Sequence, residues 1–307
     1  MSILKEALLY IHDNCNYSCS YCMLGSGAWE NKKYSKAHTE EGMKAIVDFF
    51  NKEGQWHILL SGGEPTLHPQ LIKLCKELAK ENYIRLDTNN SMEGDKLLEF
   101  INEINPNRVD FINCSLHEID EEEERLDKYL ERVKLLREKG FKAYVSYVAV
   151  PNKFQLIPKF YEIFMENNVP FVVMPFRSPK YPQNYTKEEL DILDKYMISA
   201  TNRALVSTVD RKPKGKLCNA GYKRINIDGI DGVIRKCWHG KNILGNIYEG
   251  TIELSEEPSN CDCETCTYMF EPHLEVQELL YKDLENIFSL KRTYNKELCK
   301  EYMQKSL

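Results

Sequence analysis

Residues 7–22 read ALLYIHDNCNYSCSYC, a short apolar run that leads into three closely spaced cysteines. The apolar run predicts a β-strand over residues 7–12, which places Cys15, Cys19 and Cys22 on the loop that follows. Five more runs rich in β-branched and aromatic residues predict strands over 57–61, 84–87, 109–115, 143–148 and 171–175. Apolar residues at three- and four-residue spacing predict helices between them, over 71–78, 96–104, 122–139, 155–166 and 187–205.

Strands that alternate with helices indicate an α/β fold with a parallel sheet and right-handed crossovers. In such folds reactive groups gather at the carboxyl edge of the sheet, where strands end and loops begin. The cysteine loop lies at one such strand end, and the SGGEP stretch of residues 61–65 lies at the next. This edge is where we expect the active site.

Composition and charge argue against two classes of partner, nucleic acids and membranes. Apolar residues make up 42% of the 307 residues and charged residues 29%, as expected of a soluble globular protein. The net charge of −6 provides no basic field to hold nucleic acid. The sequence has no secretory signal and no apolar run near the roughly 20 residues that span a bilayer, so we expect no membrane partner and a cytoplasmic location.

The eleven cysteines are concentrated in an early and a late group. Because the cytosol keeps thiols reduced, such clustering favours metal binding over disulfides. The early group, C-x₃-C-x₂-C, can ligate three irons of a [4Fe–4S] cube and leave the fourth iron open. A zinc knuckle and three unrelated buried cysteines are the alternatives, and the position at a strand end favours the cluster.

The triplet has an aromatic residue, Tyr21, before its last cysteine, and a Gly-Gly-Glu-Pro run follows the second strand. Together these resemble the signature of radical S-adenosylmethionine (SAM) enzymes. The resemblance implies a partial (β/α)6 TIM-like barrel in which the three cysteines hold the cube and SAM chelates the fourth iron. It assigns the methionine amino group of SAM to the second motif: Gly62, Gly63, Glu64 and Pro65. Two glycines also allow the backbone to approach a ligand closely.

Other positions match the family more loosely. By the same resemblance Asn89, Ser115 and Ser146, near the ends of later strands, are expected to contact SAM. His117 shares a strand face with Ser115 and is a candidate for moving a proton. Cys114 is a candidate hydrogen-atom donor, but strand alternation points it to the opposite face, so a packing role is favoured. Cys75 and Cys299 are predicted to be core or inert.

The late group reads C-x₁₃-G-x₄-C over Cys218 and Cys237, and then Cys261, Cys263 and Cys266. Two separated cysteines and a close pair can supply four thiolates to a second cube or to a Cys₄ zinc site. The stretch 226–232 predicts a hairpin.

This arrangement resembles the twitch extension, a short form of the SPASM domain, which implies an auxiliary [4Fe–4S] cluster on Cys218, Cys237, Cys263 and Cys266. Cys261 competes with Cys263 for one ligand position. The expected divisions are a barrel over residues 1–209, the twitch domain over 210–270 and a terminal helical segment over 271–307.

The resemblance implies reductive cleavage of SAM to a 5′-deoxyadenosyl radical that abstracts a hydrogen atom, with oxidation or epimerisation of the substrate as the outcome. It also implies a reducing partner such as flavodoxin or ferredoxin. The first strand begins about seven residues in and leaves no room for a leader-recognition domain, so we expect a small carbohydrate- or cyclitol-like substrate. A maturase of a ribosomally made peptide is the alternative, and a non-catalytic iron–sulfur or zinc protein is a remote one.

Overall fold

The computed structural model describes residues 4–22, 35–178, 180–207, 213–237, 242–264, 266 and 274–306. The chain divides into two compact units, each made of segments that are distant in sequence. The larger unit joins residues 2–143 to 219–259, and the smaller unit joins residues 144–218 to 260–307. The three-segment division expected from the sequence stays a prediction.

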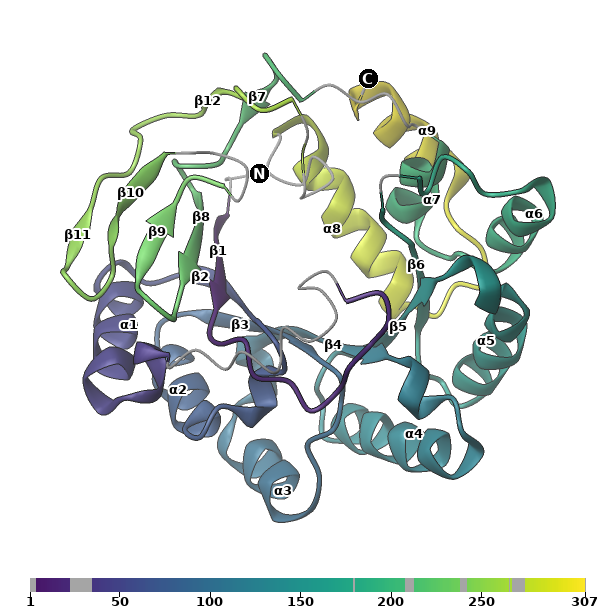
Figure 1. Cartoon of the computed structure of the whole chain (residues 1–307), viewed down its shortest axis with the longest axis horizontal. Coiled ribbons are helices and arrows are strands. Elements are labelled where there is room, and N and C mark those ends of the chain that lie inside the picture. Colours follow the sequence, from purple (N-terminus) through teal and green to yellow (C-terminus); the bar gives the residue numbers. More distant parts are fainter. Residues whose placement is uncertain are drawn as a thin grey trace. The chain divides into compact units, whose positions relative to one another are not determined.

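The larger unit contains a sheet whose centre is parallel (Figure 1). Four strands joined by crossover segments make three parallel pairs, each between strands that follow one another in the chain. Their bounds are β1 (Lys5–Tyr10), β2 (Trp56–Ser61), β3 (Tyr83–Thr88) and β4 (Val109–Leu116). The predicted strands are confirmed here, with ends that differ by one or two residues. The carboxyl ends of these strands therefore lie on one edge of the sheet.

Helices cover the outer face of this sheet in Figure 1. Their bounds are α1 (Glu40–Glu53), α2 (Leu71–Leu78), α3 (Gly94–Glu103) and α4 (Glu123–Glu138). Apolar side chains on alternate strand positions, such as Ile58 and Leu60, are fully buried, and Phe50 of α1 is buried as well. The sequence reading did not identify α1. The sequence does contain a start signal for α1, since Thr is a preferred N-cap residue. In the structure the Thr39 hydroxyl caps the helix by accepting a hydrogen bond from the amide of Gly42.

A buried network of charged side chains crosses the larger sheet near the amino ends of its strands. Glu6 of β1 accepts a bond of 2.6 Å from Arg85 of β3 and one of 2.8 Å from Arg224. Arg85 also donates to Asp110 of β4 over 2.8 Å. Because buried charges are costly unless paired, this network favours one strand register.

A second set of strands extends the larger sheet beyond β1. β8 (Arg224–Asp228) pairs in parallel with β1, and β9 (Val233–Arg235) pairs with β8 in antiparallel fashion. β10 (Ile243–Asn246) and β11 (Thr251–Ile252) continue the antiparallel part. The predicted hairpin over 226–232 is confirmed by the β8–β9 pair. Its attachment to β1 was not predicted.

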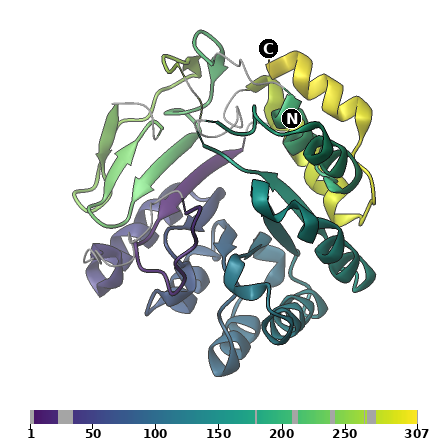
Figure 2. The same cartoon turned by 45° about the vertical axis from the view of Figure 1, so that its right-hand side comes forward.

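The smaller unit begins with the parallel pair β5 (Ala143–Ala149) and β6 (Phe171–Pro175), both as predicted. Its helices, coloured teal to yellow in Figure 2, are α5 (Ile157–Glu166), α6 (Lys187–Tyr196), α7 (Ala200–Ser207), α8 (Leu274–Phe288) and α9 (Lys296–Ser306). Helices α7, α8 and α9 share a core that includes Ala204, Leu279 and Tyr302. Cys299 is buried in this core, as predicted.

Two predicted helices are each broken in two. The expected helix 187–205 ends at Tyr196 and restarts as α7, because Asp283 of α8 binds the backbone amides of Ala200 and Thr201 and so caps a new helix start. The expected terminal helix is interrupted after α8, where Leu290 adopts a positive φ of 55°. Both corrections come from contacts or backbone angles that helical periodicity does not encode.

The fold is α/β with a parallel central sheet typical of a partial TIM barrel, as predicted. Across the described residues, none of the helices combines the length and apolar character that crossing a bilayer requires. Strands β7 (Leu217–Cys218) and β12 (Ser259–Asn260) form a separate short sheet.

Candidate active site

The cysteine loop is held against the Gly-Gly-Glu turn at the end of β2. The amide of Gly63 donates to the carbonyl of His12 over 2.7 Å, and the amide of Glu64 donates to the carbonyl of Asn14 over 2.6 Å. Asn89, at the end of β3, donates through its side chain to Oδ1 of Asn16 over 2.8 Å. The first half of the loop, which contains Cys15, is therefore tied to the ends of two neighbouring strands.

The two glycines are needed for this close approach. A Cβ atom on Gly62 would lie 2.5 Å from the carbonyl oxygen of His12, and one on Gly63 would lie 2.2 Å from that of Asn14. Gly62 also has a φ of 147°, which side chains rarely tolerate. Any larger residue in either place would push the cysteine loop away from β2.

Glu64 is buried and joins the ends of β2 and β3. Its Oε1 accepts from the amide and hydroxyl of Thr66 over 2.9 and 2.6 Å and from the hydroxyl of Thr88 over 2.7 Å. Its Oε2 accepts from the amide of Asn89 over 2.6 Å. Burial raises the pKa of Glu64, and the four hydrogen bonds oppose that rise. The expected contact of this carboxyl with an ammonium group stays a prediction.

The second half of the cysteine loop is tied to the 3₁₀ turn Glu118–Asp120, which follows β4. Both carboxylate oxygens of Glu118 accept bonds of 2.9 Å from Ser20, one from its amide and one from its hydroxyl. The hydroxyl of Tyr17 donates to Asp120 over 2.8 Å. The loop that carries all three early cysteines is thus bonded to segments that follow β2, β3 and β4.

His117 lies beside two aromatic side chains of the cysteine loop. Its Nδ1 is 3.0 Å from the hydroxyl of Tyr21, and its ring is 6.0 Å from the rings of both Tyr17 and Tyr21, measured between centroids. Burial lowers the pKa of His117 to about 4, so the imidazole is neutral at pH 7. A neutral imidazole with a hydroxyl partner can exchange a proton without first losing a charge.

The thiols of the early cysteines lie close to one another. Burial raises the pKa of Cys15, and burial with the neighbouring Cys15 and Cys22 thiols raises that of Cys19 to about 12. The amide of Tyr17 donates to the sulfur of Cys15 over 3.4 Å, and the amide of Cys22 donates to the carbonyl of Cys19. A cationic metal centre bound here would stabilise the thiolates of Cys15 and Cys19 and so offset this rise in their pKa.

Three histidines, His12, His38 and His68, pack together with ring centroids 4.7 to 6.0 Å apart. Nδ1 of His12 is 2.8 Å from Nε2 of His38, and Nε2 of His12 is 2.8 Å from the carbonyl of Glu64. Nδ1 of His68 accepts from the amide of Gln70, and its Nε2 is 3.1 Å from the carbonyl of Ala37. Burial lowers the pKa of all three imidazoles. All three are therefore neutral at pH 7, and His12 contacts the turn through the carbonyl of Glu64.

The remaining predicted residues are distributed as follows. Cys114 is fully buried and points away from the face of Ser115, which is only partly buried, as strand alternation predicted. Cys75 is also fully buried in the core, as predicted. Pro65 begins a 3₁₀ turn after Glu64.

Ser146 lies on β5 in the smaller unit and is buried. The SAM contacts of these serines stay predictions.

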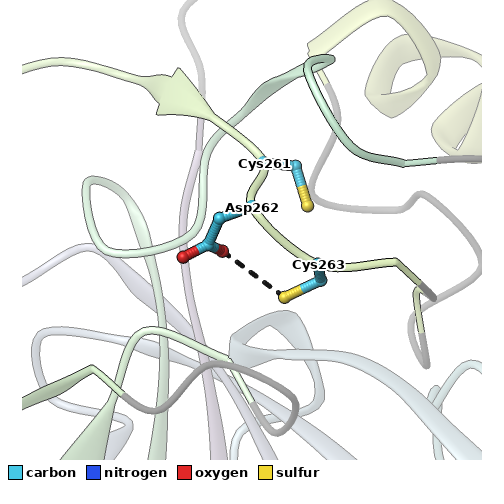
Figure 3. A group of neighbouring side chains, drawn as sticks. All are labelled: Cys261, Asp262 and Cys263. Carbon is cyan, nitrogen blue, oxygen red and sulfur yellow. Dashed lines mark hydrogen bonds between the residues drawn. The ribbon is translucent and has the colours of Figure 1, made fainter.

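Among the late cysteines, Cys261 and Cys263 converge with Asp262 (Figure 3). One ligand atom of each lies within 4.8 Å of the other two, a spacing that suits a metal ion. The thiol of Cys263 is 3.5 Å from Oδ1 of Asp262. The backbone of Cys261 is fixed by bonds of 2.8 Å, from its amide to Lys216 and from the amide of Gly215 to its carbonyl. These residues all belong to the smaller unit.

The early site has features that suit a cluster with a ligand beside it. Three thiols share one short loop, and the glycines hold backbone close to that loop. Oδ1 of Asn14 and Oδ1 of Asn113 are buried acceptors that find no hydrogen-bond partner in the described part of the chain. Buried polar atoms in native proteins are normally satisfied, so a bound polar ligand would account for them. The donor set therefore fits the group that the sequence implies.

Comparison with protein families gives a match that covers this site. Residues 9–155 match the sequence model of the Radical SAM superfamily. This range contains the cysteine loop and the ends of β2, β3 and β4. The match covers just under half of the chain and agrees with the family that the motifs predicted.

Curated relatives match mainly over this same domain. A 7-carboxy-7-deazaguanine synthase from Clostridium acetobutylicum is 31% identical over 29% of this chain and 39% of its own length. A GTP 3′,8-cyclase from Rhizobium meliloti is 29% identical over 46% of this chain and 42% of its own. The chain thus spans less than half the length of these relatives.

Solved structures match over more of the chain. The enzyme anSMEcpe, in a structure with bound AdoMet and a Kp18Cys peptide, has a TM-score of 0.54 and 16% identity, over 89% of this chain and 82% of that one. SuiB from Streptococcus suis, bound to the precursor peptide SuiA, has a TM-score of 0.55 and 18% identity, over 81% of this chain and 63% of that one. At these identities the likeness is one of fold.

The sequence did not single out Tyr17, Ser20, Glu118 and Asp120 as site residues. Glu118 lies 98 positions from Ser20, and Asp120 lies 103 positions from Tyr17. One signal was available, because Glu118 directly follows His117, which was predicted to lie at the active edge, and Asp120 lies three positions after His117.

Proposed function

We propose that this chain, whose residues 9–155 form a radical SAM superfamily domain, is an enzyme that uses a [4Fe–4S] cluster and SAM to abstract a hydrogen atom from its substrate. The observation that carries the proposal is the placement of the cysteine loop. Its backbone is bonded to the Gly-Gly-Glu turn, and its side chains to Asn89, Glu118 and Asp120. Cys15, Cys19 and Cys22 would hold the cluster.

When bound, these groups supply reductive cleavage of SAM to methionine and a 5′-deoxyadenosyl radical. The chain's own residues do the positioning. The turn through Gly62 and Gly63 presents backbone at close range to the cysteine loop. Neutral His117, next to the Tyr21 hydroxyl, can hold or pass a proton at Nδ1. An electron donor such as flavodoxin or ferredoxin would supply the electron.

An auxiliary metal centre is the second part of the proposal. Its ligands would be Cys218, Cys237, Cys263 and Cys266, in an auxiliary [4Fe–4S] cluster. The convergence of Cys261, Asp262 and Cys263 within 4.8 Å supports metal binding by this segment. It also makes Cys261 a competitor for the position given to Cys263, since the two sulfurs lie within 4.8 Å of each other. Oxidation, epimerisation and cross-linking are the reaction outcomes that such a centre could assist.

For the substrate, a peptide has more support than the carbohydrate-like molecule expected from the sequence. That expectation depended on the short stretch before β1, and no comparison supports it. The peptide-bound structures of anSMEcpe and SuiB resemble this chain in fold over four fifths of its length or more.

The test is anaerobic reconstitution with iron and sulfide, followed by reduction in the presence of SAM. The wild type should contain about eight irons and form 5′-deoxyadenosine. The Cys15→Ala/Cys19→Ala/Cys22→Ala variant should keep about four irons and form none, while Cys299→Ser, in the core of the smaller unit, should behave as wild type. A fully loaded wild type that cleaves no SAM would refute the proposal.

The auxiliary centre and the substrate are tested separately. Cys263→Ala and Cys261→Ala should be compared for iron content and for the electron paramagnetic resonance (EPR) signal. Loss of about four irons in the first alone assigns Cys263, and loss in the second alone assigns Cys261. For the substrate, peptides and small alcohols are screened for consumption that depends on SAM. Turnover of a small alcohol alone would overturn the peptide assignment.

A further inference from the structure

Glu118 makes a two-point contact with the cysteine loop that the proposed chemistry does not yet use. One carboxylate oxygen accepts from the amide of Ser20 and the other from its hydroxyl, each over 2.9 Å. Ser20 directly follows Cys19 and precedes Cys22 by two positions. A carboxylate is therefore held beside the segment between two of the cluster ligands.

Both partners of this contact are fixed by their neighbours. On the loop, Tyr17 is bonded to Asp120 over 2.8 Å and Tyr21 lies 3.0 Å from His117. On the other side, the amide of Asp120 donates to the carbonyl of His117 over 2.9 Å and closes the turn that contains Glu118. The carboxylate consequently has little freedom to leave Ser20, although the contact is exposed.

The charge and the hydrogen bond both act on the electron affinity of a nearby cluster. A negative charge beside a cluster favours its oxidised state, because reduction adds a further negative charge. Backbone amides that point at cluster sulfurs have the opposite effect, and the Ser20 amide is directed to Glu118 instead. Both contributions lower the reduction potential.

We propose that Glu118 is a positioning residue that holds the cysteine loop through Ser20 and lowers the reduction potential of the cluster on Cys15, Cys19 and Cys22. The inference rests on the proposed function, since it assumes that these cysteines hold a [4Fe–4S] cluster. A lower potential makes the reduced cluster a stronger donor toward SAM. It also requires a stronger reductant to load the electron.

The test is an anaerobic redox titration followed by EPR, with Cys263 and Cys266 both replaced by Ala so that only the early cluster contributes. Glu118→Gln keeps the size of the side chain and removes the charge. At a fixed solution potential near the midpoint, it should raise the reduced-to-oxidised ratio about tenfold, which is about 60 mV for one electron. The rise should shrink in high salt, because the contact is exposed.

Three further variants separate charge from structure. Glu118→Asp keeps the charge and should give a midpoint close to wild type. Ser20→Ala removes only the hydroxyl bond and should also stay close to it. Glu131→Gln removes an exposed carboxylate from α4 and controls for net charge.

The outcomes separate a failure of the role proposed for Glu118 from a failure of the proposed function. Equal midpoints in Glu118→Gln and Glu131→Gln, with about four irons in each, overturn the role of Glu118 and leave the proposed function intact. If Glu118→Gln loses its iron, the midpoint of Glu118→Asp is compared with that of the wild type instead. A midpoint that is raised by about 60 mV in Glu118→Asp, although the charge is retained, overturns the inference. A wild-type loop that holds no iron overturns both.

Discussion

The backbone amide of Asn89 donates a hydrogen bond of 2.6 Å to Oε2 of Glu64 and so connects the ends of two neighbouring strands. Asn89 then uses its side chain to reach Asn16 in the cysteine loop. Glu64, meanwhile, donates its own amide to the carbonyl of Asn14 in the same loop. The pair therefore positions the cysteines from two sides, while the carboxyl itself accepts hydrogen bonds from its own turn and from the end of β3.

Glu64→Gln should destabilise the larger unit by about 2 kcal/mol. The amide oxygen of Gln can replace Oε1 and accept from Thr66 and Thr88, but its NH₂ group then faces the donor amide of Asn89. Urea denaturation followed by circular dichroism measures the change. Glu99→Gln, at an exposed position of α3, is the control and should leave the midpoint within error. Equal midpoints for the two variants would contradict the linking role of Glu64.

Gly63→Ala should abolish cluster binding by the early cysteines. The new Cβ would meet the carbonyl oxygens of Asp13 and Asn14 at 2.5 and 2.2 Å, so the cysteine loop must move. Iron analysis after reconstitution should show a loss of about four irons. Gly94→Ala is a suitable control, because it also adds a methyl group but has no neighbour within 4 Å. Its positive φ of 59° should cost about 1 kcal/mol of stability without loss of iron.

Stability should fall as the pH drops from about 6.5 to about 4. The His68 imidazole is fully buried and has a pKa of about 4 in the folded protein, against 6.5 as the ordinary value. In this window the unfolded chain binds more protons than the folded one, so protonation favours unfolding. The full effect of His68 is about 3 kcal/mol.

Urea midpoints at pH 7, 6 and 5 measure this dependence. In His68→Gln the new side chain does not titrate in this range. The variant should be less stable than the wild type at pH 7, but its stability should depend less steeply on pH. The lowered pKa values of His12, His38 and His117 should keep the remainder of the slope. An unchanged slope in the variant would assign the pH dependence to other groups.

Asp283→Asn should destabilise the smaller unit by about 2 kcal/mol. Asp283 is buried, and its carboxylate accepts from the amides of Ala200 and Thr201 and from the hydroxyls of Ser199 and Thr201. An Asn side chain would direct NH₂ hydrogens at one set of these donors. Hydrogen exchange of the α7 amides measures the loss of protection. Glu285→Gln, on an exposed face of α8, should leave the exchange unchanged.

Local pattern was sufficient to predict the strands and the cysteine loop. Runs such as His57–Ser61 are short and rich in β-branched or apolar residues, and the order of strands and helices then implies the parallel sheet. The early triplet and the Gly-Gly-Glu run could be placed on one edge by the same argument, because both follow strands. The fully buried position of Cys114 followed from strand alternation alone.

Contacts between distant positions could not be predicted in this way. The restart of α7 depends on Asp283, which is 83 positions from Ala200. The contact of Ser20 with Glu118 depends on how the loop and the turn after β4 meet in space. Periodicity and composition report what a segment prefers by itself, and these contacts depend on which segments become neighbours.

The parallel pairing of β1 with β8 has a consequence for synthesis of the chain. The first partner of β1, β2, is complete at Ser61, but the second is complete only at Asp228. While the intervening residues are being made, one edge of β1 has no strand beside it and can pair with another nascent chain. Slower translation between residues 61 and 228 lengthens the time for which this edge is open, so it should lower the yield of soluble chain.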